Sequence, residues 1–389
     1  MASKLTAAEK EAYRRAISIP TSIQTQILPK TNISIHEFCK YTLPPVQATV
    51  STSPADALSF YSKSPPALAN ADLLRKIKYL PIPSPSVIQA VRDAAKKAWL
   101  DGYTSVRYIH LDDTATTCFP LWIISFWTEV LVLAKVLKSW RKSVEWLKQQ
   151  KRTKKADVHR EAAEQCELML RVLPWGVEKQ GVSDNEPIHS LWRLLGPNWL
   201  SGSVMNDLLH LLRSEADNDA TFQFEGTALT QKVCEAFKPP KDDEYHQDTK
   251  FRWLRTVGED MVRNNKLILT YAHINENHWG LVIIDPKQRC IHLGDSLGIE
   301  NVPNNIKNAY LRWSKALTQT EFTIQALDIG RQTDSVSCGI FAHLGAACFL
   351  LPTKHGATEH RNIERARMTL FTQIAGCILQ LVSLSKLAP

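Results

Sequence analysis

The sequence predicts an α+β protein in which a mainly helical N-terminal region precedes a domain of mixed strands and helices. Two patterns predict this class. Apolar residues recur every three or four positions through the middle of the chain, which is typical of amphipathic helices. From about residue 188, short β-rich runs alternate with turn residues and with further helical segments. A chain of 389 residues with 44% hydrophobic content is long enough for two or three domains.

The N-terminal half divides into two parts by composition. Residues 1–85 are rich in Pro, Ser and Thr, which favours extended or loosely ordered chain. Residues 86–180 are expected to be helical and basic. They contain a helix over 87–100, a longer helix from Pro120 to about Leu147, and a third over 157–172. The last two are expected to form an antiparallel pair.

The positive charge of the chain is concentrated in this helical region. Between Thr116 and Arg160 there are ten Lys or Arg against three Asp or Glu, an excess of seven in a chain of net charge +8. Such a region is suited to nucleic acid or to an acidic partner, and the basic run at 148–155 is also typical of a nuclear-import signal. A solvated face of a helical hairpin is the open alternative.

The cysteines and the apolar segments indicate the compartment. Eight cysteines are scattered without a CxxC pair or zinc-site spacing, and the charged N-terminus lacks the apolar core of a secretory signal. The most apolar run, 121–134, contains Glu129 and is shorter than the roughly 18–20 residues of a membrane span. We therefore expect free thiols and an intracellular protein, in the nucleus or cytoplasm, without a membrane partner.

The C-terminal domain, 188–389, is expected to combine an antiparallel meander with helices. Runs rich in β-branched residues are separated by turn-forming NENH and DPKQ. The expected strands are 266–274, 279–286, 289–295 and 321–329, and the expected helices are 304–317, 339–351 and 361–387.

Four polar residues in this domain have the chemistry of a thiol protease. His278 begins a strand after a turn, and Asp295 ends the neighbouring strand, so the carboxylate can orient the imidazole. Cys338 lies where a polar loop becomes an apolar helix, and the helix dipole there stabilises a thiolate. Gln332, six residues earlier, can direct its amide at an oxyanion. Each residue alone has an ordinary structural interpretation, and the hypothesis depends on the four together.

These motifs resemble the catalytic core of a known family. HWGLVIID (278–285), GDS (294–296) and RQTDSVSCGIF (331–341) are similar to the ubiquitin-like-protein-processing cysteine proteases, the SUMO-specific or Ulp-type group. WLSGSVMN (199–206) is similar to the family's WLND opening motif. The resemblance covers about residues 190–388. It implies a papain-like or adenain-like fold with a central mixed sheet flanked by helices.

The resemblance also implies roles for the four residues. Cys338 corresponds to the nucleophile, His278 to the general base and Asp295 to the group that orients the base. Gln332, with the backbone N–H of Cys338, corresponds to the oxyanion hole. The reaction requires no metal and no organic cofactor.

The resemblance further implies how substrate binds. Trp199 and Trp279 match two indoles that clamp the C-terminal Gly-Gly of a modifier in a narrow tunnel. Ser201 and Gly202 depart from the family's Asn and Asp at these positions. The missing Asp would contact the modifier, so the departure bears on which modifier is bound and not on the chemistry.

The sequence therefore predicts a cysteine protease or isopeptidase that cuts after the C-terminal Gly-Gly of a SUMO-like modifier, with that modifier and its conjugates as partners. One alternative is a mobile-element-associated protease that cuts other proteins. Another is an inactive protease-fold protein that acts as a basic nucleic-acid-binding scaffold. The intact set of four residues favours the first hypothesis.

Overall fold

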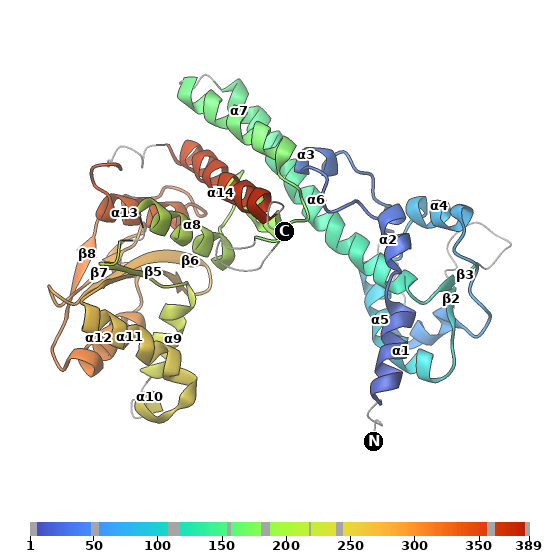
Figure 1. Ribbon diagram of the computed structural model, residues 1–389, viewed down its shortest axis with the longest axis horizontal. Helices are drawn as coiled ribbons and strands as arrows, with labels where there is room; N and C mark the ends of the chain where they lie inside the picture. The colour runs from blue at the N-terminus through green and yellow to red at the C-terminus, as the bar shows by residue number, and fades with distance from the viewer. Residues whose placement is uncertain are drawn as a thin grey trace. The chain divides into compact units, whose positions relative to one another are not determined.

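Helix α6 (Ile123–Arg152) contains the point at which the chain divides into two units, Met1–Arg141 and Lys142–Pro389. Both units are drawn in Figure 1, a ribbon of the computed structural model. The structure describes residues 6–47, 54–107, 117–153, 157–179, 187–217, 219–238, 244–355 and 362–385.

The first unit combines helices with a small antiparallel sheet. Its strands pair in the order β1–β2–β3. The elements are α1 (Ala7–Ile17), α2 (Thr21–Ile27), α3 (Ile35–Phe38), a 3₁₀ helix (Pro54–Phe60), β1 (Tyr61–Ser62), α4 (Ala71–Tyr79), α5 (Pro85–Leu100), β2 (Ser105–Arg107) and β3 (Cys118–Pro120).

Four helices lie within residues 1–85, where the composition predicts loosely ordered chain. Local signals account for them. Thr6 and Ser34 each form a capping box, at the start of α1 and of α3. Helix α4 buries Leu73, Leu74 and Ile77 on one face. Helix caps and the spacing of apolar residues therefore predict the structure of this region better than its overall Pro and Ser content does.

The helices expected in the basic region are present, with one shifted start. Helix α5 begins at Pro85 after Ser84, and α7 spans Asp157–Val172. Helix α6 begins three residues after Pro120, because Pro120 pairs with Ser105 in the β2–β3 ladder. Lys154 and Lys155 of the basic run lie outside the described residues. Among the described residues, no helix has both the length and the apolar character needed to cross a bilayer.

A five-stranded mixed sheet is the centre of the second unit. The strands pair in the order β4–β5–β6–β7–β8; the two edge pairings are parallel and the two inner pairings are antiparallel. The predicted meander and the fourth strand are confirmed. The three-residue β4 is too short to give a periodic signal. The strands are β4 (Phe222–Phe224), β5 (Leu267–Ile274), β6 (His278–Asp285), β7 (Cys290–Gly294) and β8 (Thr323–Leu327).

Helices cover both faces of this sheet (Figure 1). The helices α8 (Gly202–Glu215), α13 (Cys338–Leu350) and α14 (Ile363–Ser385) lie on one face. The helices α9 (Ala228–Ala236), α11 (Arg252–Asn264) and α12 (Asn304–Thr318) pack on the other with one buried core. The short α10 (Glu244–Gln247) and 3₁₀ helices at Ile188–Leu194, Thr249–Phe251 and Ile299–Asn301 complete the unit.

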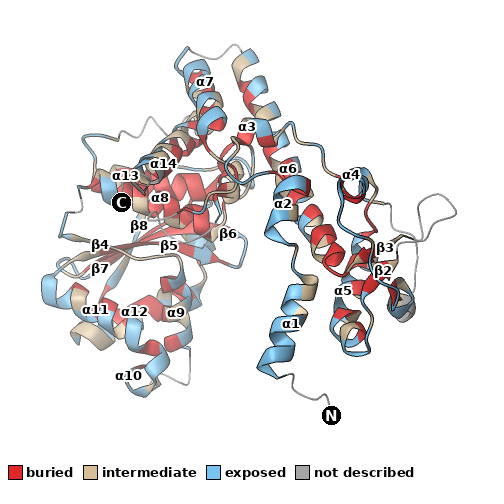
Figure 2. Cartoon of the chain, turned by 45° about the vertical axis from the view of Figure 1, so that its right-hand side comes forward, coloured by how far each residue is buried: buried red, intermediate tan, exposed pale blue. Residues whose placement is uncertain are grey.

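Burial on both faces explains the composition of the central strand. Every residue of β6 is buried, and Figure 2 shows the buried interior between the two helical layers. A strand covered on both sides needs a nearly continuous apolar run, as HWGLVIID has. The expected α+β class with a central mixed sheet, after a mainly helical N-terminal region, is thus confirmed.

Candidate active site

Cys338 is the first residue of α13 and is 1% exposed. The loop before it is shaped by the carboxylate of Asp334. Its Oδ1 accepts hydrogen bonds from the backbone N–H groups of Val336 and Ser337, both at 2.8 Å, and its Oδ2 accepts from Ser337 Oγ at 2.7 Å. This compact turn directs the chain into the helix, so the sulfur lies at the positive end of the helix dipole.

His278 and Asp295 meet at one end of the sheet. Because β6 and β7 are antiparallel, the start of β6 lies beside the end of β7. His278 Nε2 lies 2.9 Å from Asp295 Oδ1, which also accepts from the Leu297 N–H at 2.7 Å. Cys338 is close enough to His278 to act on the charge of its imidazole. The structure therefore brings together three of the four sequence-predicted residues.

These contacts determine the charge state of the imidazole. Burial lowers the pKa of His278, but the hydrogen bonds and negative charges of Asp295 and Cys338 outweigh it and raise the pKa to about 9. At neutral pH the imidazole is consequently protonated. An imidazolium beside a sulfur stabilises the thiolate, which is the nucleophilic form of cysteine.

Gln332 is held next to this group by the residue that follows Asp295. Its Oε1 accepts from Ser296 Oγ at 2.7 Å, and its backbone N–H donates to the Ser296 carbonyl at 3.1 Å. Its Nε2 donates to the Asp334 carbonyl at 2.8 Å. None of these bonds involves Cys338. A side-chain amide has two N–H donors, so one of them is left for a ligand.

Trp279, the residue after His278, belongs to a cluster of three aromatic rings with Trp199 and His273. The rings of Trp199 and Trp279 stack with centroids 5.8 Å apart and planes 24° apart. His273 stacks on Trp279 at 4.5 Å and lies 5.3 Å from Trp199. Trp279 Nε1 donates to the Leu200 carbonyl at 2.8 Å, which fixes the indole against the segment that carries Trp199.

His273 is a site residue that sequence reasoning missed. It lies inside a predicted strand without a motif around it, and the β5–β6 register places it directly opposite Trp279. Burial lowers the pKa of His273, so the ring stays neutral and suited to stacking. The alternation of β5 alone could not identify it, because the pairing with β6 had to be known.

An open groove of about 820 Å³ borders this cluster. Trp199, Gly202, His273 and Trp279 line it. Trp279, which lines the groove, also packs against Gly339 in the first turn of α13. A Cβ built on Gly339 would lie 2.8 Å from Met205 Sδ and 3.3 Å from Trp279 Cδ1. Only glycine allows the helix that carries Cys338 to approach the indole this closely.

Comparisons with known proteins agree with this arrangement. Residues 198–380 match the family described as the Ulp1 protease family, C-terminal catalytic domain. The chain is 25% identical over 160 residues to ubiquitin-like-specific protease 1 of Saccharomyces cerevisiae, a match that covers 39% of this chain. It spans only 23% of the yeast protein's length.

Solved structures of such domains are also similar. The C-terminal Ulp1 protease domain in complex with Smt3, the yeast ortholog of SUMO, is 15% identical over 55% of this chain and 94% of that chain, with a TM-score of 0.43. The Chaetomium thermophilum Ulp1-like SUMO protease catalytic domain is 15% identical over 58% of this chain and 90% of that chain, with a TM-score of 0.42. The part of this chain that is similar to the Ulp1 protease family is thus residues 198–380, a little under half of its length.

Proposed function

We propose that this protein is a cysteine protease or isopeptidase that hydrolyses the bond after the C-terminal Gly-Gly of a SUMO-like modifier. One observation carries the proposal: the imidazole of His278 lies 2.9 Å from Asp295 and is influenced by the sulfur of Cys338, which begins a helix. The base therefore has the orienting group on one side and the nucleophile nearby, as thiol catalysis requires.

The reaction follows from this arrangement. The Cys338 thiolate adds to the scissile carbonyl carbon, and the Cys338 backbone N–H and the Gln332 amide stabilise the resulting oxyanion. His278 then gives its proton to the leaving amine as the C–N bond breaks, which leaves a thioester on Cys338. Neutral His278 next takes a proton from water, whose oxygen attacks the thioester. The modifier leaves as a carboxylic acid that gives its proton to solvent water, and the thiolate and imidazolium are restored.

The aromatic cluster supports selectivity for glycine. The two indoles stack with centroids 5.8 Å apart, which is too close for a chain to lie between them, so a substrate would lie along the groove wall that they form. A chain that carries only hydrogen at Cα approaches such an aromatic wall most closely. The SUMO-like identity of the modifier is supported by the similarity to ubiquitin-like-specific protease 1 and to the Ulp1 domain that was solved with Smt3.

Electrophilic probes test the proposal directly. The full chain is incubated with SUMO and with ubiquitin, each carrying a thiol-reactive group in place of the terminal carboxylate, and adducts are detected by mass. We expect an adduct with the SUMO probe that is lost in Cys338→Ala and kept in Cys348→Ala. Reaction with ubiquitin alone would overturn the choice of modifier, and reaction with neither probe would overturn the proposal.

The same Cys338→Ala variant separates binding from chemistry. Turnover should vanish, because no other group forms the thioester. Affinity for SUMO should stay within a few-fold of the unmodified chain, because the groove and its indoles are intact. Calorimetric titration measures that affinity, and loss of binding together with turnover would show that the substitution damaged the site.

A further inference from the structure

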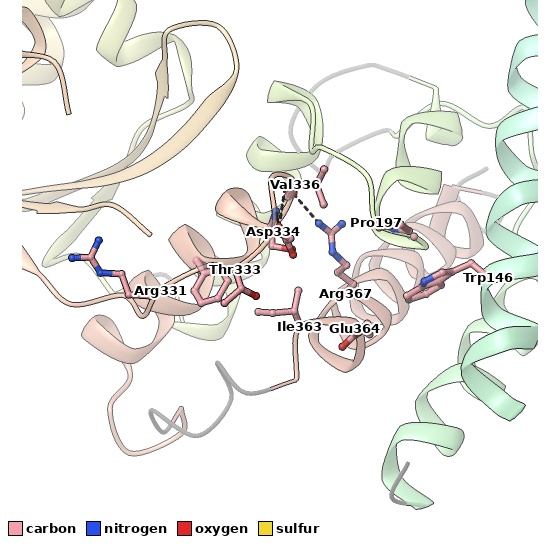
Figure 3. A pocket seen from close by; sticks show the side chains of 12 residues that line it. Trp146, Pro197, Arg331, Thr333, Asp334, Val336, Ile363, Glu364 and Arg367 are labelled. Carbon is pink, nitrogen blue, oxygen red and sulfur yellow. Dashed lines mark hydrogen bonds between the residues drawn. The ribbon is translucent and has the colours of Figure 1, made fainter. Parts of the chain in front are cut away.

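A second hollow, of about 550 Å³, lies beside the loop that carries Cys338 (Figure 3). Its lining includes Ser337 and Phe341, whereas Gly339 lies against Trp279 of the aromatic groove. Successive helical residues are about 100° apart, so Gly339 and Phe341 project from nearly opposite sides of α13. The hollow and the groove therefore flank the first turn of the helix, with Cys338 between them.

The walls of the hollow combine an apolar part with a polar part. Trp146, Pro197 and Ile363 face it from α6, from the segment before Trp199, and from the start of α14 (Figure 3). All three side chains are only partly buried or are exposed, so they are accessible from the hollow. Trp146 and Pro197 precede residue 198, where the match to the Ulp1 family begins. Part of the wall of this hollow is therefore formed by residues that lie outside the segment that matches the Ulp1 family.

One side of the hollow carries a buried cation. Arg367 is 2% exposed; its guanidinium donates to the carbonyl of Arg193 at 3.1 Å and to that of Val336 at 2.9 Å (Figure 3). Within the described part of the chain, no carboxylate lies within 4.0 Å of it. Asp334 and Glu364 also line the hollow, and their negative charges act on Arg367. Asp334 is engaged by three hydrogen bonds with its own loop. A buried guanidinium with no carboxylate in ion-pair contact can bind an anionic ligand.

We propose that this hollow is the leaving-group site of the enzyme. It receives the polypeptide that follows the scissile bond, with an apolar side chain against Trp146 and Ile363 and a carboxylate directed at Arg367. The proposal rests on the proposed function: if Gly-Gly occupies the groove on one side of Cys338, the chain beyond the cut bond emerges on the other side. The substrate class is thus a modifier joined to a segment that carries both an apolar and an acidic residue.

Three substrates of the full chain test this. The first is SUMO joined to aminomethylcoumarin, a small leaving group without a polypeptide. The second and third are SUMO fused after Gly-Gly to a tail that begins with alternating Leu and Glu, or to an alanine tail. We expect the unmodified chain to cut the Leu-Glu tail with a kcat/KM several-fold above that of the alanine tail. Equal rates on the two tails would overturn the proposal.

Variants of the walls give the second readout, which is the ratio of kcat/KM on the Leu-Glu tail to that on the coumarin substrate. Trp146→Ala should lower this ratio roughly ten-fold, since a large apolar contact is lost. Ile363→Glu should lower it further, because a new carboxylate repels the acidic tail. Trp253→Ala, at an exposed tryptophan of α11, is the matched control and should leave the ratio unchanged.

The use of a ratio separates the two proposals. A general loss of folding or of chemistry lowers both rates and leaves the ratio intact, and thermal denaturation reports folding independently. An unchanged ratio in both wall variants would overturn the leaving-group site while leaving the protease proposal in place. Failure of the unmodified chain to cut any of the three substrates would instead refute the proposed function.

Discussion

The protonation of His278 links the geometry of three side chains to the pH range of activity. The imidazole shares a hydrogen bond with Asp295 and is influenced by Cys338. Because these interactions raise its pKa to about 9, the imidazolium persists well above neutral pH. In the proposed reaction, the protonated form stabilises the thiolate and gives a proton to the leaving amine.

The activity of the unmodified chain should therefore fall as the pH rises through about 9. In Asp295→Asn the charge that raises the pKa of His278 is lost, so the alkaline limb should move to lower pH and the maximal rate should drop. Profiles of kcat/KM against pH on the coumarin substrate measure both effects. An alkaline limb at the same pH in both proteins would show that Asp295 does not set the pKa of His278.

The same shift has a consequence for stability. A histidine with a raised pKa in the folded state stabilises the fold fully below its unfolded value, near 6.5, and this contribution is lost as the pH rises through about 9. The melting temperature of the unmodified chain should accordingly fall over this range. In His278→Ala the fall should be smaller, as scanning calorimetry at several pH values can establish.

Gly202 is where the chain departs from the family's opening motif, and the site has room for a side chain. A Cβ there would lie 3.4 Å from Thr227 Oγ1 and 3.8 Å from Trp279 Cη2, distances that a small shift accommodates. Gly202 is also the first residue of α8, where a negative charge complements the helix dipole.

Gly202→Asp should thus stabilise the fold by about 0.3–1 kcal/mol through the dipole. It should also increase affinity for SUMO if the added carboxylate restores the contact that the family resemblance implies. Urea unfolding and calorimetric titration with SUMO test the two effects separately. Gly202→Asn, which adds a side chain of similar size without the charge, is the matched control.

At the scale of elements, a buried ion pair attaches the segment before the family domain to helix α8. Lys179 Nζ lies 2.7 Å from Asp207 Oδ2 and donates to Ser203 Oγ at 2.6 Å, and both charged side chains are 0% exposed. A buried pair contributes little relative to an apolar pair, but removing one partner leaves a buried charge uncompensated.

Lys179→Met should consequently destabilise the fold by about 3–5 kcal/mol. The double variant Lys179→Met/Asp207→Leu should recover most of that loss, since no charge is then buried. Guanidinium unfolding of the two variants and the unmodified chain measures the difference. A double variant as unstable as the single one would show that packing, not charge, is decisive here.

Some elements followed from local sequence and others did not. Strands β5 to β8 and helices α12 and α13 carry long periodic runs with turn residues at their ends, so they were predictable. Helices α8, α9 and α11 were not predicted, although Ser201 caps the start of α8 and Asn265 ends α11 in the left-handed conformation. We also predicted that the basic residues of α6 bind nucleic acid or an acidic partner, and this stays a prediction.

At the scale of the whole molecule, the second unit begins well before the match to the Ulp1 family. Cys166 of α7 donates to the Met368 carbonyl of α14 at 3.3 Å, and Ser143 of α6 donates to the Trp192 carbonyl at 3.1 Å. Leu147, Leu170 and Leu173 are also buried. The helical region that the sequence places outside the protease domain, from 142 onward, thus contributes to its core.

A chain that begins at Lys142 should therefore fold and cut the coumarin substrate at a rate close to that of the full chain. A chain that begins at residue 198 should be unstable, because α14 would lose the cover of α7 and Asp207 would lose Lys179. Circular dichroism and activity of the two shortened chains test this. A stable, active chain from residue 198 would show that residues 142–197 are dispensable.

The sequence by itself determined the class of the fold, the order of its main strands and helices, and the four polar residues with the chemistry of a thiol protease. These depend on periodicity, turn residues and side-chain type, all of which are local. The tertiary structure decided the contact of His278 with Asp295, the place of His273 beside two indoles, and the hollow shared by Trp146 and Arg367. Each of these brings together segments far apart in the chain, and their contacts depend on strand register and helix packing, which local periodicity does not specify.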